Sequence, residues 1–274
     1  VNGARTAECL SRLMTKDASV LMPGQSMKAL WLNDAGAVRG VGVVARYADD
    51  QFLVVSAATD LAWFVEAARQ FDLSLRDMTE SYGGVAIIGP YANTILKAIG
   101  VEEPIAPLAF RRLFWHGLDL TVSRWGEQFG FEVWCAAQDS FTVWDRLLKA
   151  GAPYGIRPAG LDAADILDIE AGVPRHGRDY HVATDGFTAA PTPGSLGLES
   201  LADETHTTFN GRKGWRAARS SESRTLVGIE IDSETPASFT LLTRSGIVAG
   251  QTLTSVYSPV LRRAIALALC VCGS

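Results

Sequence analysis

The spacing of apolar positions changes several times along the chain, and each change predicts a different kind of element. Residues 4–14 place Ala7, Leu10 and Met14 on one face, which is the spacing of an amphipathic helix. Residues 27–57 instead show short apolar runs divided by turn residues, which predicts a three-stranded meander. Helical spacing returns in four later segments, 60–68, 91–99, 141–150 and 162–173.

The middle of the chain alternates strands with helices. Two apolar runs meet at His116-Gly117, which predicts a hairpin, and Phe131 to Cys135 alternates as a half-buried strand does. This alternation favours an α+β sandwich of the ferredoxin-like kind. From Ser223 onward only strand-like runs remain, and their short spacing is typical of a small β-barrel.

Composition narrows the class of protein without identifying it. The 274 residues are 47% apolar and 20% charged, as in an ordinary globular protein. The net charge of −5 and the lack of a Lys/Arg run argue against a nucleic-acid partner. No apolar stretch is long enough to span a bilayer, and no signal peptide is visible. Four scattered cysteines without a CxxC pair fit a reducing, cytoplasmic setting.

Candidate chemistry is sparse. The four histidines have neither zinc spacing nor a serine elbow nearby, and no Ser-His-Asp or Cys-His arrangement survives inspection, so we expect no metal. Glu132 is the exception, because it lies inside an apolar strand between Phe131 and Val133. On the polar face it is an ordinary exposed glutamate, whereas on the core face it needs a donor partner.

Two motifs in register resemble the glycine-cleavage T-protein (aminomethyltransferase) family. Gly126-Glu127 followed by Gly130-Phe131-Glu132-Val133 is similar to the family's Gly-Glu and Gly-Phe-Glu-Ile signature. After an amphipathic helix, residues 160–172 (GLDAADILDIEAG) are similar to its Glu-Ala-Gly helix, and residues 253–268 to its Tyr-Ser-Pro segment. The resemblance covers residues 2 to about 269, nearly the whole chain.

The resemblance implies a T-protein-like α+β fold. Ferredoxin-like α/β sandwich regions surround a folate site, and a C-terminal β-barrel domain follows. We therefore expect a folate-binding, aminomethyltransferase-like region of two intertwined subdomains at 1–220 and a truncated barrel at 221–274. Family members have a further N-terminal segment that contributes to the folate pocket and usually more strands at the C-terminus, so we expect this sequence to be a fragment.

The resemblance also implies three tetrahydrofolate-binding residues, each with an ordinary alternative. Glu132 would accept hydrogen bonds from the pterin amino group and the adjacent ring N–H. Trp125 occupies the place of a family tyrosine that walls the pterin, although a core tryptophan is the plain alternative. Arg212 would pair with the anionic folate tail, unless it is a solvated or ion-paired arginine at a helix start.

The chain departs from the family where the catalytic carboxylate belongs. The family's aspartate pair is matched by Gly40 and Val41, a folate-contacting asparagine by Ala57, and an arginine by Ala164. No catalytic residue is therefore identified.

The resulting hypothesis is a tetrahydrofolate-dependent aminomethyl or methyl transferase, served by a small one-carbon donor or a lipoyl carrier protein. The alternatives are a folate-dependent demethylase, the folate domain of a methylglycine-oxidising enzyme, and a non-catalytic folate-binding protein.

Overall fold

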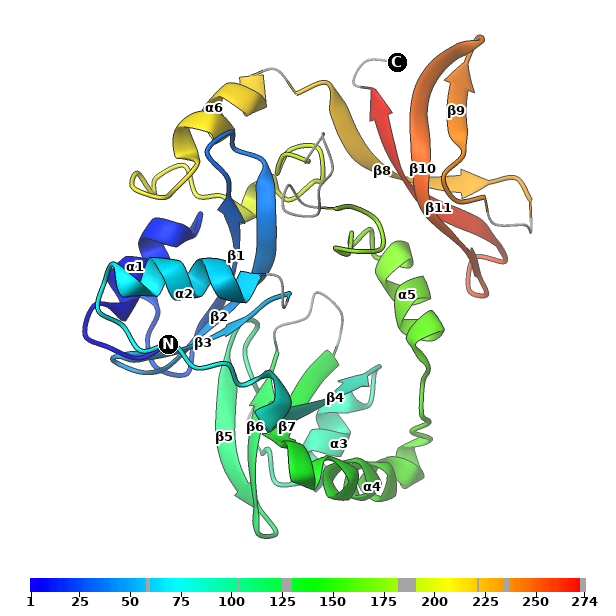
Figure 1. The fold of residues 1–274 in the computed structure, drawn as a ribbon. Coiled ribbons are helices and arrows are strands. Elements are labelled where there is room, and N and C mark those ends of the chain that lie inside the picture. Colours follow the sequence, from blue (N-terminus) through cyan, green and yellow to red (C-terminus); the bar gives the residue numbers. More distant parts are fainter. Residues whose placement is uncertain are drawn as a thin grey trace. The chain divides into compact units, whose positions relative to one another are not determined.

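The computed structural model describes residues 1–57, 60–102, 104–124, 130–181, 191–220, 222–233 and 237–271 (Figure 1). Within this part the chain forms two compact units, which are described one at a time. The first unit comprises Val1–Cys9, Ala18–Lys28 and Gly42–Pro158, and the second comprises Leu10–Asp17, Ala29–Val41 and Ala159–Ser274. The domain boundary expected at 220/221 stays a prediction.

The elements follow the order expected from the apolar pattern. The α-helices are α1 (Thr6–Leu13), α2 (Leu61–Arg69), α3 (Ala92–Ala98), α4 (Ser140–Gly151), α5 (Leu161–Glu170) and α6 (Arg212–Ser220). The first strands are β1 (Ser26–Leu32), β2 (Val38–Ala48), β3 (Gln51–Val55), β4 (Tyr82–Ile88), β5 (Phe110–Trp115), β6 (Leu118–Ser123) and β7 (Gly130–Ala136). The last strands are β8 (Arg224–Ile231), β9 (Leu241–Arg244), β10 (Ile247–Ser258) and β11 (Arg263–Val271). No helix in the described ranges is both long and apolar enough to cross a membrane.

The predicted meander forms a three-stranded sheet in the order β1-β2-β3. Strand β2 pairs antiparallel with β3, from Val43 opposite Val55 to Ala48 opposite Gln51. Strands β1 and β2 each contribute residues to both compact units, since the units divide after Lys28 and before Gly42.

The first unit is built around an antiparallel sheet in the order β4-β7-β6-β5. Helices α3 and α4 cover one face of this sheet, where they enclose an extensive hydrophobic cluster. Its buried members include Ile87, Leu96, Ile99, Leu120, Val122, Phe131, Val133, Val143 and Leu147. This arrangement confirms the α+β sandwich expected for the middle of the chain. It also leaves the even-numbered residues of β7 on the opposite face.

The β5–β6 hairpin turns at the residues that the sequence indicates. His116 and Gly117 both have positive φ, 48° and 86°, as a tight two-residue hairpin turn requires. The strands pair in register from Trp115 opposite Leu118 to Phe110 opposite Ser123. The hairpin therefore presents Ser123 at the end of β6, beside β7.

The second unit contains the expected β-rich C-terminal region. Strands β8 to β11 form an antiparallel sheet in the order β8-β11-β10-β9. Ile169 of α5 packs against Ile265 and Leu267 of β11 in a small apolar cluster. The prediction of an all-β C-terminal region is confirmed, whereas closure into a barrel stays a prediction because the described strands form an open order.

Candidate functional site

Glu132 lies on β7, a central strand of the four-stranded sheet. It faces Ala86 of β4 on one side and Ser123 of β6 on the other. Its neighbours Phe131 and Val133 belong to the buried cluster beneath α3 and α4, so the strand's alternation directs Glu132 to the other face. The side chain is half-buried there, which places it between the two possibilities that the sequence left open.

The indole of Trp134 holds the Glu132 carboxylate. Trp134 is two residues further along β7, and its Nε1–H donates a hydrogen bond to Glu132 Oε2 at 3.0 Å. Burial raises the pKa of Glu132, while the Trp134 hydrogen bond, the Lys28 ammonium and the Ser123 hydroxyl each lower it by a smaller amount. The Ser123 hydroxyl oxygen is buried, and among the residues that the structure describes it has no hydrogen-bond partner of ordinary length and angle. The carboxylate therefore retains acceptor capacity in a partly desolvated position.

The raised pKa of Glu132 predicts a stability cost at neutral pH. A carboxyl group whose folded pKa exceeds its unfolded value stabilises the fold below the unfolded pKa, about 4.5, and this contribution is lost as pH rises through the folded pKa. Glu132→Gln should therefore raise the melting temperature at pH 7–8, and the gain should shrink toward pH 4. Thermal unfolding across this pH range measures it, with the exposed Glu80→Gln as the matched control. A variant that is less stable than the parent at pH 7 would contradict this prediction.

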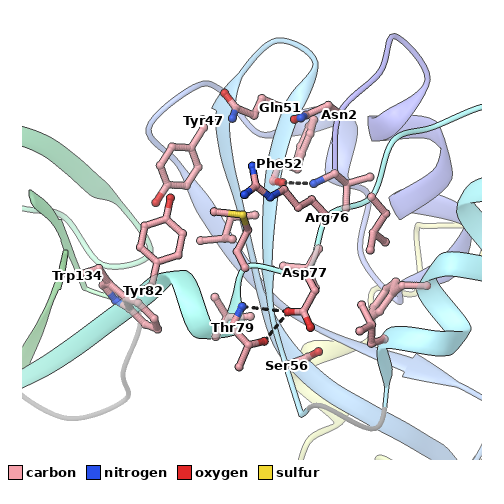
Figure 2. Close-up of a pocket in the computed structure, with 18 of the residues that line it drawn as sticks. Asn2, Tyr47, Gln51, Phe52, Ser56, Arg76, Asp77, Thr79, Tyr82 and Trp134 are labelled. Carbon is pink, nitrogen blue, oxygen red and sulfur yellow. Dashed lines mark hydrogen bonds between the residues drawn. The ribbon is translucent and has the colours of Figure 1, made fainter. Parts of the chain in front are cut away.

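A cavity of about 470 Å³ lies beside Trp134 in the same unit (Figure 2). The hydroxyls of Tyr47 and Tyr82 point toward each other at one end of it (Figure 2). Burial raises the pKa of Tyr47, partly offset by a hydrogen bond from Thr121. Glu132 is not one of the lining residues, so Trp134 joins two distinct features, the cavity wall and the donor that holds the carboxylate.

The Trp31 ring fills the space beside Gly40, the residue that the resemblance aligns with the family's catalytic carboxylate. A Cβ atom on Gly40 would lie 2.1 Å from Nε1 and 2.4 Å from Cε2 of Trp31. Trp31 is fully buried, so the ring has little freedom to move aside. Val41, the second matched position, packs against the apolar cluster that contains Leu30 and Val38. These contacts leave no room for an aspartate at residue 40 in this packing.

The other two predicted folate residues give different outcomes. Arg212 begins α6 and donates from Nε to the His206 carbonyl at 3.1 Å and from Nη2 to the Glu204 carbonyl at 3.3 Å. These bonds support the turn before the helix, and the folate-tail role of Arg212 stays a prediction. Trp125 lies outside the described residues. Among the described residues, no group of three His, Cys, Asp or Glu side chains is placed to hold a metal ion.

Sequence reasoning missed the residues that surround Glu132. Trp134 had a readable signal, because residues i and i+2 of a strand lie on the same face. Lys28 and Ser123 are about 104 and nine residues away in the chain, and only the tertiary fold brings them close enough to affect the carboxylate. Trp31 was equally hidden, since its contact with Gly40 depends on the packing of β1 against β2.

Comparison with known proteins places this geometry in a family. The model of the GCVT N-terminal domain matches residues 1–190. An aminomethyltransferase of Geobacillus thermodenitrificans is 33% identical over 98% of this chain and 75% of that protein. One from Pseudothermotoga lettingae is 32% identical over 72% of this chain and 55% of that protein. The crystal structure of the glycine cleavage system aminomethyltransferase T from Bartonella henselae matches with a TM-score of 0.82, at 22% identity over 98% of this chain and 74% of that one.

The mixed fold, with its several antiparallel sheets, is therefore the fold of an aminomethyltransferase. The chain belongs to the glycine-cleavage T-protein (aminomethyltransferase) family, as its two motifs predict. Members of this family are transferases that use tetrahydrofolate, and the glycine-cleavage T-protein works with a lipoyl-carrying protein. These comparisons confirm the predicted family, fold class, enzyme class and cofactor.

Proposed function

We propose that this chain binds tetrahydrofolate with the pterin ring against Glu132 and transfers a one-carbon unit between the folate and a small donor. The observation that carries the proposal is the half-buried carboxylate on the Gly-Phe-Glu strand, oriented by the Trp134 indole. The membership of this chain in the aminomethyltransferase family indicates the class of reaction. Bound folate carries the one-carbon unit, so the protein's own task is to bind and orient it.

The carboxylate suits a pterin for a specific reason. An ionised carboxylate is an acceptor only, and the Trp134 N–H occupies just part of its capacity. A pterin edge offers an amino group and a ring N–H side by side, which a carboxylate accepts as a fork. Such charge-assisted hydrogen bonds offset the desolvation that raises the pKa of Glu132. The residues present therefore fit the group that the family uses.

The Gly40 position favours a donor other than an aminomethyl-lipoyl carrier. In the family that position holds a carboxylate close to the reacting nitrogen, whereas here the indole of Trp31 fills the space. We infer that a small methyl donor, which needs no carboxylate to orient an amine, is the better match. This second candidate is a folate-dependent demethylase on the same fold.

Calorimetric titration of the full chain tests the folate assignment. Tetrahydrofolate should bind saturably, and p-aminobenzoylglutamate, which lacks the pterin, should bind at least about tenfold more weakly, because Glu132 contacts the pterin. Equal affinity for both compounds would contradict the role of Glu132. Incubation with tetrahydrofolate and small O-, N- and S-methyl donors then reports 5-methyltetrahydrofolate if the demethylase candidate is correct, and none if the chain only binds folate.

A further inference from the structure

Ser123 is a fully buried serine beside the Glu132 carboxylate. It ends β6, where it pairs with Glu132 of β7 on one side and with Phe110 of β5 on the other. Residues directly opposite each other in an antiparallel sheet point to the same face, with Cβ atoms about 4.5–5.5 Å apart. A phenylalanine side chain has no hydrogen-bond acceptor of ordinary strength. Of the two side chains directly opposite Ser123, Glu132 is therefore the one that its hydroxyl can donate to.

The hydroxyl of Ser123 differs from those of the other buried serines in the described ranges. Each of the others donates a hydrogen bond, Ser26 for example to the Leu108 carbonyl at 2.7 Å and Ser255 to the Ile265 carbonyl at 3.0 Å. Ser123 has no described partner of ordinary length and angle. A buried hydroxyl without a partner destabilises the fold, because it has lost its hydrogen bonds to water. Stability of the free protein therefore does not explain this serine.

The Glu132 carboxylate has capacity for the missing hydrogen bond. Its Oε2 accepts from the Trp134 indole at 3.0 Å, and no described residue donates to Oε1 at ordinary length. An ionised carboxylate has about four lone-pair positions. The Trp134 N–H, the Ser123 O–H and the two N–H groups of a pterin edge would fill all four. Ser123 already lies near enough to lower the pKa of Glu132. Rotation about its χ1 between staggered positions redirects the hydroxyl without moving the strand.

We propose that Ser123 is a positioning residue for Glu132, whose hydroxyl rotates to donate to the carboxylate and fixes the orientation that a pterin edge requires. This inference rests on the proposed function, because the ligand is the same folate. Ser123 is fully buried, so it acts through Glu132. Among the described residues, the other groups that act on Glu132 are the Lys28 ammonium from β1 and the neutral Trp134 indole. The loss of folate binding at acid pH should therefore follow the protonation of Glu132.

Ser123→Ala tests the hydrogen bond in the free protein. An NMR titration of the Glu132 side-chain carboxyl carbon, assigned by its absence from Glu132→Gln, should give a higher pKa in the variant, because the charged form loses a donor. The variant should be at least as stable as the parent, since it removes a buried hydroxyl without a partner. Ser255→Ala is the matched control. It removes a buried hydroxyl that has a partner, so it should lower the melting temperature and leave the pKa of Glu132 unchanged.

Titration calorimetry with tetrahydrofolate tests the effect on binding. Ser123→Ala should bind about tenfold more weakly than the parent at pH 7, because the carboxylate is less well oriented. As the pH falls, binding by the variant should fail at a higher pH than in the parent. Ser123→Cys is similar in size to serine but is a weak donor, so it should show the same changes and exclude an effect of lost volume.

Two outcomes would overturn the proposal. An unchanged pKa of Glu132 in both Ser123→Ala and Ser123→Cys would show that the hydroxyl does not engage the carboxylate. A fall in melting temperature of Ser123→Ala as large as that of Ser255→Ala would show that the hydroxyl has a structural role. Absence of tetrahydrofolate binding by the parent protein would instead contradict the proposed function, and the carboxyl titration would still decide whether Ser123 acts on Glu132.

Discussion

Replacing Glu132 by glutamine should weaken tetrahydrofolate binding by about 1.5–3 kcal/mol, because the variant loses a charged hydrogen-bond partner of the pterin. Glutamine keeps the shape of the side chain but turns one acceptor oxygen into an NH2 group. That group is a donor, and it would face the donors of the pterin edge. The loss corresponds to roughly a 10- to 150-fold rise in Kd. Titration calorimetry of both proteins with tetrahydrofolate at pH 7 measures it.

Trp134→Phe tests how much the hydrogen bond from Trp134 contributes to the function of the Glu132 carboxylate. Phenylalanine keeps an aromatic ring in the cluster with Ala45 and Phe110 but removes the Nε1–H donor. Its loss should raise the pKa of Glu132 further, since this hydrogen bond lowers it. Folate binding by the variant should then begin to fail at a higher pH than in the parent protein. Equal affinity of Glu132→Gln and the parent would show that Glu132 does not contact the folate.

The features that could be predicted from the sequence depend on neighbours close in the chain. The His116-Gly117 turn follows from local turn chemistry, and the β7 strand follows from alternation within five residues. Glu132 could be singled out because a carboxylate interrupts an apolar strand. Its half-buried state could not, since burial depends on what covers the opposite face of the sheet.

The features that could not be predicted depend on side chains packed across strands. From the sequence, Gly40 shows only that a carboxylate is absent at this position. The neighbouring residues in the chain do not indicate that the Trp31 ring occupies the space. The pairing of Asn2 was equally hidden, because its two bridge partners, Gln51 and Ser74, lie 49 and 72 residues away in the chain. Pairing at that separation is set by the assembled fold, whereas periodicity describes only single elements.

The Trp31–Gly40 contact predicts weak or absent glycine-cleavage activity. A positioned charged group at such a site typically contributes a factor of about 10²–10³ in rate, and neither Gly40 nor Val41 supplies one. Reconstituted glycine synthesis, with the lipoyl carrier and decarboxylase partners, should therefore run at least about 100-fold slower than with an authentic aminomethyltransferase assayed in parallel. Turnover comparable with that enzyme would show that the carboxylate is dispensable and that this prediction is wrong.

Two variants test whether the closed space is the cause. Gly40→Asp alone should lower the melting temperature without restoring activity, because its Cβ would lie 2.1 Å from the buried Trp31 ring. Trp31→Leu combined with Gly40→Asp opens room for the carboxylate and should recover part of the missing rate. Trp31→Leu alone is the matched control, since it opens the same space without adding a charge. An increase in glycine synthesis in this control would assign the block to the indole ring itself, and not to the missing aspartate.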